Sequence, residues 1–309
     1  TWLRIYDDMT KYPGEQEITS ALARLEDGAL TAGFLAGHGE RSIVRDEDGD
    51  YSGFAADKDS RSSLVNTGFD VVQVNADSTV APDLLVIADP SRPISPDEQR
   101  NILSYLEHGG NLLLTVEQED AAQVDWLLSY LGVSVADTIL TLPGSPAAPD
   151  LIPGTVTEAA VALSRYLAAG LPVSMPSAAA LSVNAESSWL CTPALELARG
   201  SMLGVALCRQ IEGREQRVIV LGDADCLSNA EMSIKRKSLK AYNSTFRTGV
   251  FNWLSGGRLP VDISRQSPVD NTIRISKSSA FIWMLIFKWF FPALLAICGI
   301  TLILRRQMR

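Results

Sequence analysis

Histidine and cysteine are scarce in this chain, which has only two histidines and four cysteines among 309 residues. The histidines, His38 and His108, cannot form an HExxH pair, and no two cysteines form a CxxC motif. These absences argue against a zinc ribbon, a dithiol redox centre and an HExxH metalloprotease. A P-loop and a G-x-S-x-G elbow are also absent. We therefore expect no metal, no cofactor and no catalytic residue in this chain, and we assign any ATP hydrolysis to a partner subunit.

Positive charge is also sparse outside the C-terminal end. The formal net charge is −9. Residues 264–309 contain seven Lys/Arg and one Asp, so that segment carries +6 and the remainder carries −15. An acidic body repels phosphate backbones, so we do not expect nucleic acid as a partner.

One long apolar run is present at the C-terminus. Residues 280–304 contain a single charged residue, and as a helix they would reach roughly 37 Å at about 1.5 Å per residue, which is enough to cross a bilayer. The run therefore predicts a transmembrane helix. Arg305 and Arg306 follow it directly, which favours a cytoplasmic tail over 305–309 and an extracytoplasmic body, periplasmic at the bacterial inner membrane. The sequence begins at Thr1, so we expect the export signal to lie upstream.

Lys288 and Pro292 lie inside this apolar run. The lysine either extends its amino group to the outer interface or faces a polar group on a partner membrane subunit. Proline is expected to kink the helix, which neighbouring helices can accommodate. Both residues are therefore candidate contacts with a membrane partner.

The body shows an alternation of strands and helices. Four short apolar runs, at 30–37, 69–75, 83–90 and 111–118, are typical of strands that are covered on both faces. Between the last two, Ser95-Pro96-Asp97-Glu98 is a capping box that begins a helix, and Gly109-Gly110 ends it. The pattern predicts an α/β fold with a mostly parallel, flavodoxin-like sheet and flanking helices.

The rest of the body is less regular. We predict helices at 121–131 and 239–254 and a hairpin of strands 203–209 and 217–222. A proline- and alanine-rich insert at about 135–190 is expected to be irregular around one short helix near 158–169. These elements give one extracytoplasmic domain over 1–262, with core strands in 30–118 and 203–222. A polar tether over 263–279 then leads to the membrane segment.

The segment "GFLAGHGERS" follows the first predicted strand and contains Gly37, His38, Gly39 and Glu40. It lacks the third glycine of a dinucleotide fingerprint. The structural interpretation is a strand end where glycines let the backbone turn. Because open α/β sheets bind ligands at the carboxyl ends of their strands, these four residues are also binding candidates.

Two further strand ends carry polar residues. Asp223, Asp225 and Asn229 follow the last predicted strand, and Asp89 follows the third. Two carboxylates two residues apart could hold Mg²⁺ or Ca²⁺, but such residues more often form turns or cap helices. We keep all four as binding candidates without a metal.

Three cysteines in the body, Cys191, Cys208 and Cys226, allow one disulfide in an oxidising compartment, or they are buried thiols. Asn243-Ser244-Thr245 matches a glycosylation sequon by pattern only.

Several blocks in order resemble a known family. "GFLAGHGERS", "GFDVVQVN", "DLLVIADPSRPISPDEQRNILSYLEHGGNLLLTVE" and "RVIVLGDADCLSN…FNWLSGG" are similar to the GldG-type auxiliary components of ABC transporters, which end in a C-terminal membrane span. The resemblance runs from about Glu15 onward, and Cys226 departs from the aromatic that is usual there. It implies a domain of the kind found in intraflagellar-transport proteins and class I glutamine amidotransferases, without the amidotransferase cysteine.

The same resemblance implies an ABC permease and a cytoplasmic ATPase as partners, in some bacteria linked to gliding motility. The predicted function is a membrane-anchored, non-enzymatic accessory subunit that binds a substrate or partner protein outside the cytoplasm. The alternative is an anchored hydrolase that uses His38 with Glu40, or a metal at Asp223 and Asp225.

Overall fold

The computed structural model describes residues 3, 13–77, 81–142, 150–197, 200–233, 240–261 and 276–307. The chain divides into two compact units, Thr1–Ile263 and Ser264–Arg309. Most of the predicted tether, and residues 308–309 of the predicted tail, lie outside the described residues.

Five parallel strands form the centre of the sheet in the first unit. Their order is β2-β1-β3-β4-β11, and all four neighbouring pairs are parallel. The order of the first four, with β11 in the fifth place, is that of flavodoxin-like sheets. The predicted α/β fold with mostly parallel core strands is confirmed. The strands are β1 (Leu30–Leu35), β2 (Phe69–Val74), β3 (Leu84–Ala88), β4 (Asn111–Thr115) and β11 (Arg214–Leu221).

The sheet continues beyond β11 with antiparallel strands. The predicted hairpin is confirmed, since β10 pairs with β11 around a turn in which Glu212 and Gly213 have φ of 50° and 80°. The order then runs β10-β9-β6-β7, while β8 pairs with β10 and β5. These strands are β5 (Val133–Ile139), β6 (Leu151–Val156), β7 (Pro172–Pro176), β8 (Ala179–Val183), β9 (Leu190–Glu196) and β10 (Met202–Ile211).

The prediction of an irregular insert at about 135–190 was wrong. The segment contains β6, β7, β8 and most of β5, and the helix expected near 158–169 is only the short 3₁₀ turn Ala159–Ala162. The strand signal in β6 is the alternation that buries Ile152, Gly154 and Val156. Prolines in this segment obscure that alternation. Strand β7 tolerates its two prolines because it is the last strand in the order.

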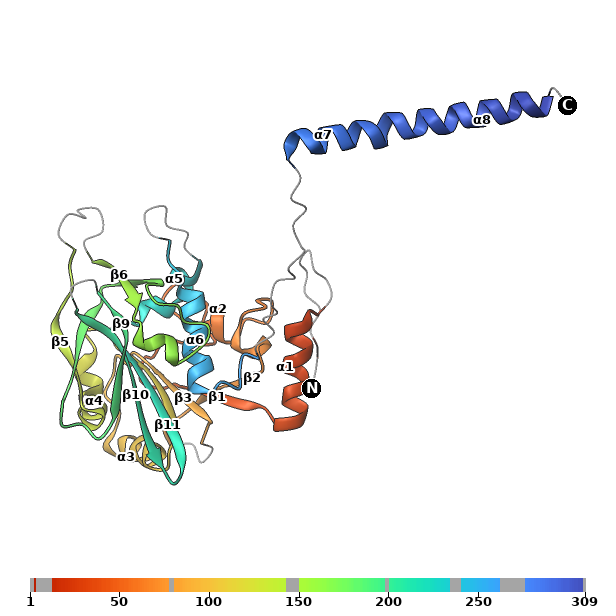
Figure 1. Ribbon diagram of the computed structural model, residues 1–309. Coiled ribbons are helices and arrows are strands. Elements are labelled where there is room, and N and C mark those ends of the chain that lie inside the picture. The colour runs from red at the N-terminus through yellow and green to blue at the C-terminus, as the bar shows by residue number, and fades with distance from the viewer. Residues whose placement is uncertain are drawn as a thin grey trace. The chain divides into compact units, whose positions relative to one another are not determined.

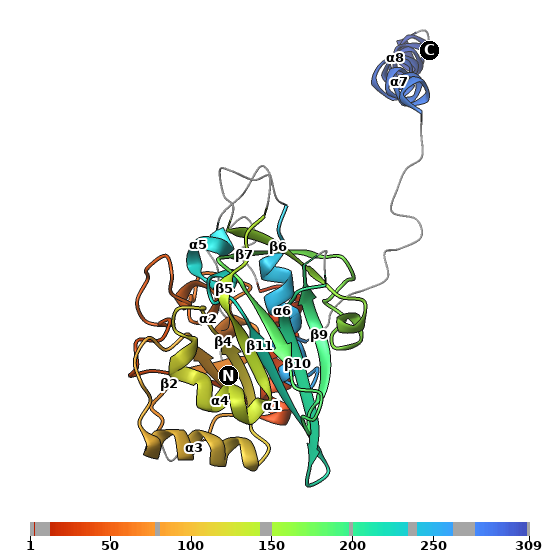
Figure 2. The same cartoon turned by 90° about the vertical axis from the view of Figure 1, so that its left-hand side faces the viewer.

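Helices cover both faces of the sheet (Figures 1 and 2). α3 (Pro96–Glu107) and α4 (Asp125–Leu131) share one apolar cluster with the sheet, while α2 (Ser52–Ala55) and α6 (Asn243–Leu254) share the other. The predicted capping box is present in α3, where Ser95 Oγ accepts from Glu98 N at 3.4 Å. The helix predicted at 121–131 is a 3₁₀ turn, Ala121–Val124, followed by α4, and α6 begins at Asn243. The body also contains α1 (Glu15–Asp27) and α5 (Asn229–Ser233).

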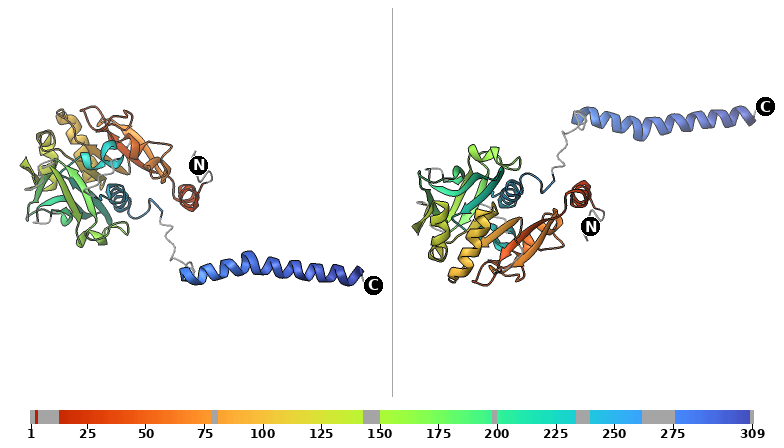
Figure 3. Two further views of the ribbon diagram at one scale, coloured as in Figure 1. Left: turned by 90° about the horizontal axis from the view of Figure 1, so that it is seen from above. Right: turned by 90° about the horizontal axis from the view of Figure 1, so that it is seen from below.

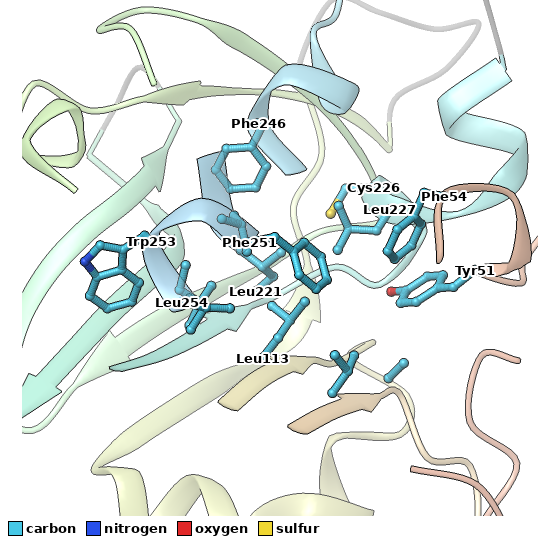
Figure 4. Packing of buried hydrophobic residues seen from close by; sticks show 14 of the residues in the cluster. Tyr51, Phe54, Leu113, Leu221, Cys226, Leu227, Phe246, Phe251, Trp253 and Leu254 are labelled. Atoms are coloured by element: carbon cyan, nitrogen blue, oxygen red, sulfur yellow. The ribbon is translucent and has the colours of Figure 1, made fainter. Parts of the chain in front are cut away.

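The centre of one cluster is aromatic (Figure 4). Phe251 of α6 lies 5.9 Å from Phe54 and 6.0 Å from Phe69, measured between ring centroids. Tyr51 continues the group at 5.1 Å from Phe54. This packing fixes α2 and the preceding loop against the sheet, close to the ends of the parallel strands.

The second unit is a long helix, drawn as one rod in Figure 3. α7 (Lys277–Leu285) continues through a π turn, Ile286–Phe290, into α8 (Phe291–Gln307). The helix from Ser279 to Gln307 has 29 residues, and an 18-residue window within it has a mean hydropathy of 2.0, so it is long and apolar enough to span a membrane. Pro292 lies two residues beyond the end of the π turn. Since proline has no N–H to donate, a wider turn accommodates it within a continuous helix.

The cysteine and sequon alternatives are also resolved. All three body cysteines are free. Cys191 packs with one apolar cluster and Cys208 with the other, so these neighbours on β9 and β10 lie on opposite faces of the sheet. Asn243 is only 4% exposed, and its amide exchanges hydrogen bonds of 2.9 and 2.8 Å with the Ser174 backbone. Its side chain is therefore not available for glycosylation in the fold.

Candidate functional site

Four parallel strands end at one edge of the sheet, and each is followed by a charged residue. Asp89 follows β3 directly, Glu117 lies two residues beyond β4, and Asp223 lies two residues beyond β11. Arg41 comes from the loop after β1. Together with Asp225, these residues form what we call the carboxyl-edge cluster.

Arg41 is the cation of this cluster. Its Nη2 lies 3.1 Å from Asp89 Oδ2 and 3.7 Å from Glu117 Oε1, and its Nη1 lies 3.0 Å from Asp225 Oδ1. One guanidinium therefore joins three segments that are far apart in the sequence. The backbone adds to this link, because Arg41 N donates to Ala88 O at 2.9 Å.

Asp89 occupies a strained backbone position. Its φ is 52°, in the left-handed region that non-glycine residues seldom adopt. Its Oδ1 accepts from Glu117 N at 2.9 Å, while its backbone N–H donates to Thr115 O. The carboxylate therefore ties the end of β3 to the end of β4. Burial raises the pKa of Asp89 above its ordinary value, although the Glu117 N–H and Arg41 oppose the shift.

Glu117 and Asp223 form a buried acidic pair. Glu117 Oε1 accepts from Ala224 N at 2.8 Å and from Asp225 N at 3.1 Å. Asp223 is fully buried; its Oδ1 accepts from Cys226 N at 2.9 Å, and its Oδ2 has no hydrogen-bond partner. Burial raises the pKa of Glu117 to about 7, and the charges of Asp225 and Asp89 raise it further. Burial also raises the pKa of Asp223 well above its ordinary value, and the charge of Glu117 adds to that shift.

Asn229 fastens a loop rather than facing a ligand space. Its Oδ1 accepts from Gly53 N at 2.8 Å, and its Nδ2 donates to Glu47 O at 2.9 Å and to Ser52 Oγ at 3.0 Å. Its backbone N–H donates to Asp50 O. These bonds join α5 to the loop that follows β1. The Tyr51 hydroxyl adds another link, since it donates to Ala224 O at 2.7 Å.

His38 lies among carboxylates of its own. Its Nδ1 lies 3.2 Å from Glu40 Oε1, and its Nε2 lies 3.3 Å from Glu98 Oε2. Glu40 also accepts from His38 N at 2.7 Å. The predicted glycine turn is present, with φ of 130° at Gly37 and 81° at Gly39. The GHGE segment thus docks on the start of α3.

The structure therefore divides the predicted site residues into two groups. Asp89, Asp223 and Asp225 belong to the carboxyl-edge cluster, whereas His38 and Glu40 pair with Glu98. Arg41 and Glu117 were missed by the sequence interpretation. Glu117 could have been found, because it follows the run "NLLLTV" just as Asp223 follows "RVIVLG". Nothing in the sequence indicated which cation would join these acids.

The chemistry available at this edge is limited. Cys226 is fully buried and its thiol donates to Asp223 O at 3.3 Å, and burial raises the pKa of this thiol well above its ordinary value. Among the described residues, no group of three or more His, Cys, Asp or Glu side chains is arranged to hold a metal ion. The cluster is best described as an internal network of ion pairs and hydrogen bonds.

Residues 30–137 match the model of a family described as an ABC-type uncharacterized transport system, the ABC_transp_aux family. Over these residues the chain is similar to an auxiliary component of such a system. This confirms the resemblance predicted from the sequence, while the gliding-motility subtype stays a prediction. The matched segment includes β1 to β4 and α3, with Arg41, Asp89 and Glu117 of the cluster. No curated protein matches the chain.

Solved structures show the fold. The mmIFT52 N-terminal domain aligns with a TM-score of 0.55 and 16% identity, and the match covers 72% of this chain and 97% of that one. Weaker matches are the exo-β-1,4-mannosidase Op5Man5 from Opitutaceae bacterium strain TAV5 and a β-galactosidase from Rahnella sp. R3. The mannosidase has a TM-score of 0.41 and 13% identity, covering 78% of this chain and 38% of that one. The galactosidase has a TM-score of 0.40 and 13% identity, covering 75% and 32%.

Proposed function

We propose that this chain is a membrane-anchored, non-enzymatic accessory subunit of an ABC-type transport system. Its folded body lies outside the cytoplasm of a bacterial cell and binds a substrate or partner protein, and its C-terminal helix docks on the permease. A cytoplasmic ATPase subunit supplies the energy. The chain is coupled to ATP hydrolysis because it makes different contacts in two states of the transporter.

The observation that carries the proposal is the family match over residues 30–137 together with the C-terminal helix. An auxiliary component of a transport system that also has a membrane-length helix fits an anchored subunit. Arg305 and Arg306, which follow the apolar run directly, support the stated orientation.

The state of the candidate nucleophiles supports a non-enzymatic role. The Asp89 carboxylate is held by the Glu117 N–H and by Arg41, and the Cys226 thiol is buried beside two carboxylates. The ring nitrogens of His38 both face glutamates. A hydrolase would need a free nucleophile with a base within hydrogen-bond reach.

The exposed part of the carboxyl edge is the surface we assign to partner binding. The Asp225 side chain is 40% exposed and that of Arg41 is 22% exposed, so both can be reached from solvent. Ser91 and Arg92 are exposed beside the GHGE turn, where Arg92 N donates to His38 O. Because the inner bonds of the network fix these groups, the surface is preorganised.

The decisive experiment is purification of the tagged full chain from its native membranes in a mild detergent, with quantitative identification of the membrane proteins that accompany it. We expect an ABC permease and an ATPase in a fixed ratio to the chain. An Asp225→Ala variant tests the binding surface, and Val44→Ser, which alters a 72% exposed residue, is its matched control.

Two results would contradict the proposal. One is a chain that purifies without any permease from membranes in which the transporter is present. The other is hydrolase activity that survives purification and is lost in a His38→Asn variant, which would favour the hydrolase alternative. Alkaline carbonate washing and protease treatment of intact spheroplasts test the anchor and the orientation separately.

A further inference from the structure

A cavity of about 300 Å³ lies beside the first turns of α6, away from the strand ends described above. Its lining includes Arg61, Ser62, Ser244, Thr245 and Arg247. Its volume is at the lower end of the range for ligand pockets, so it suits a small group rather than a large molecule.

Arg247 is a buried cation without an acidic partner. The residue is only 4% exposed; its Nη2 donates to Ser62 O at 2.9 Å, and its guanidinium carbon lies 5.5 Å from the centroid of the Phe54 ring. Its Nε is buried and, within the part of the chain that the structure describes, donates to no acceptor. Among the described residues, no carboxylate pairs with it. Burial alone lowers the pKa of Arg247 to about 10, so it stays positive at neutral pH.

Arg41 and Arg247 differ in their counter-charges. Arg41 meets three carboxylates, which offset the cost of removing its charge from water. Arg247 has only a backbone carbonyl and an aromatic face. A buried charge without a counter-charge is costly, and an anion in the cavity would reduce that cost.

The start of α6 adds hydrogen-bond donors to the same cavity. The helix has 12 residues, and its N-cap residue, Tyr242, provides no side-chain cap. The first hydrogen bond inside the helix is from Phe246 N to Tyr242 O. The backbone N–H groups of Ser244 and Thr245, which precede it, have no acceptor among the described residues. A helix start with free N–H groups favours negative charge.

The other charged groups around the cavity largely balance each other. Arg61 pairs with Glu17 of α1, with its Nη1 2.6 Å from Glu17 Oε1. The charge that remains uncompensated is that of Arg247. The cavity wall therefore combines one unpaired buried guanidinium, free helix N–H groups and the hydroxyls of Ser244 and Thr245.

We propose that this cavity binds an oxyanion group, a phosphate, sulfate or carboxylate, with Arg247 as its counter-charge and the N-terminal N–H groups of α6 as donors. The site is separate from the carboxyl edge and does not depend on the function proposed above. The anion can be free in solution or part of a larger molecule such as a phosphorylated glycerol headgroup.

The test uses the full chain in a nonionic detergent. Calorimetric unfolding of the body is followed while phosphate, sulfate, acetate or glycerol 3-phosphate replaces chloride at constant ionic strength. We expect a saturable rise of the unfolding temperature, by about 2 °C or more, with at least one oxyanion. A stronger response to glycerol 3-phosphate than to inorganic phosphate assigns the group to a headgroup, and the reverse order assigns it to a free anion.

Variants test whether the oxyanion binds at Arg247 and the start of α6. Arg247→Met is expected to weaken oxyanion binding by about tenfold or more, measured by isothermal titration. Ser244→Asp places a carboxylate in the exposed first turn of α6, so it should raise the unfolding temperature and remove the response to added anions. Ser104→Asp adds the same charge to an exposed position on α3 and should keep the response.

A wild-type chain whose unfolding temperature does not respond to any oxyanion would overturn the proposal. A response that persists in Arg247→Met would overturn it as well. If Arg247→Met does not fold, Ser244→Asp decides, because a full response in that variant would place the anion elsewhere.

Discussion

The Arg41 guanidinium and the Asp89 carboxylate meet at 3.1 Å where β1 and β3 end, and no sequence motif links these two residues. Asp89 accepts this contact while its own backbone is in the left-handed region and its second oxygen holds Glu117 N. The strain at Asp89 is therefore offset by bonds to two neighbouring strand ends. This contact explains why acids from separate strands can gather at one edge.

Removing the Arg41 cation should lower the stability of the body, because the clustered carboxylates then repel each other. In Arg41→Met, the carboxylates of Asp89, Glu117 and Asp225 lose their shared counter-charge, and we expect the free energy of unfolding of the body to fall by roughly 2–3 kcal/mol. Chemical denaturation of the full chain in detergent measures it. Arg45→Met is the control: the Arg45 side chain is 55% exposed, so losing its pair with Asp50 should lower the stability clearly less than losing Arg41 does. Equal losses in the two variants would contradict the assigned role.

The buried acidic pair predicts that the body loses stability as the pH rises. Burial raises the pKa of Glu117 to about 7 and that of Asp223 well above its ordinary value, so the folded state holds protons that the unfolded chain releases above about pH 4. Their stabilising contribution is complete below about pH 4. The contribution of Glu117 declines as the pH rises through about 7, and the raised pKa of Asp223 adds a contribution of the same sign.

Asp223→Asn isolates this effect. An amide oxygen can still accept from Cys226 N, but the side chain no longer carries a charge that must be removed on folding. We expect the variant to be more stable than the wild type at pH 8, and the difference to shrink toward pH 5. Denaturation curves at the two pH values measure both quantities. A wild-type slope that is unchanged in Asp223→Asn would show that Asp223 is not the group responsible.

Local sequence patterns predicted the parallel half of the fold because that half follows local rules. The apolar runs of β1, β3 and β4 are buried on both faces, and the capping box at Ser95 begins α3. Apart from the β10–β11 hairpin, the antiparallel half was missed, since β6 and β7 contain glycine and prolines and depend on pairing with each other and with β9. A local sequence pattern does not show which distant strand a segment pairs with.

The candidate site was also predicted only in part. Strand ends at one edge of a parallel sheet must lie close together, so the grouping of Asp89 with Asp223 and Asp225 follows from topology. His38 was expected at the same place, but Glu40 and Glu98 hold it beside α3. Charge pairing decides such details, and it depends on side chains from segments that the sequence separates by up to sixty residues.

Asn229 gives a prediction about local stability. It accepts from Gly53 N and donates to the Glu47 carbonyl and the Ser52 hydroxyl, so Asn229→Ala leaves several polar groups of the loop unpaired. We expect a loss of about 2–3 kcal/mol, with faster amide hydrogen exchange confined to residues 46–53 and the start of α5. Ser233→Ala, which removes only a bond to Ala230 O, is the control on the same helix. Protection of the loop that is unchanged in Asn229→Ala would contradict the assigned role.

The last prediction concerns Lys288, which lies in the π turn of the C-terminal helix. A lysine near the middle of a membrane costs about 2.5–3.5 kcal/mol unless it reaches the interface or meets a polar partner, and π turns often occur at functional sites. If its amino group contacts the permease, Lys288→Leu should lower the amount of permease that accompanies the purified chain by about tenfold, while Lys288→Arg should keep most of it. Quantitative mass spectrometry of the detergent-solubilised complex measures the ratio. An unchanged ratio in Lys288→Leu, with the protein still resistant to carbonate extraction, would show instead that the side chain only extends to the membrane surface.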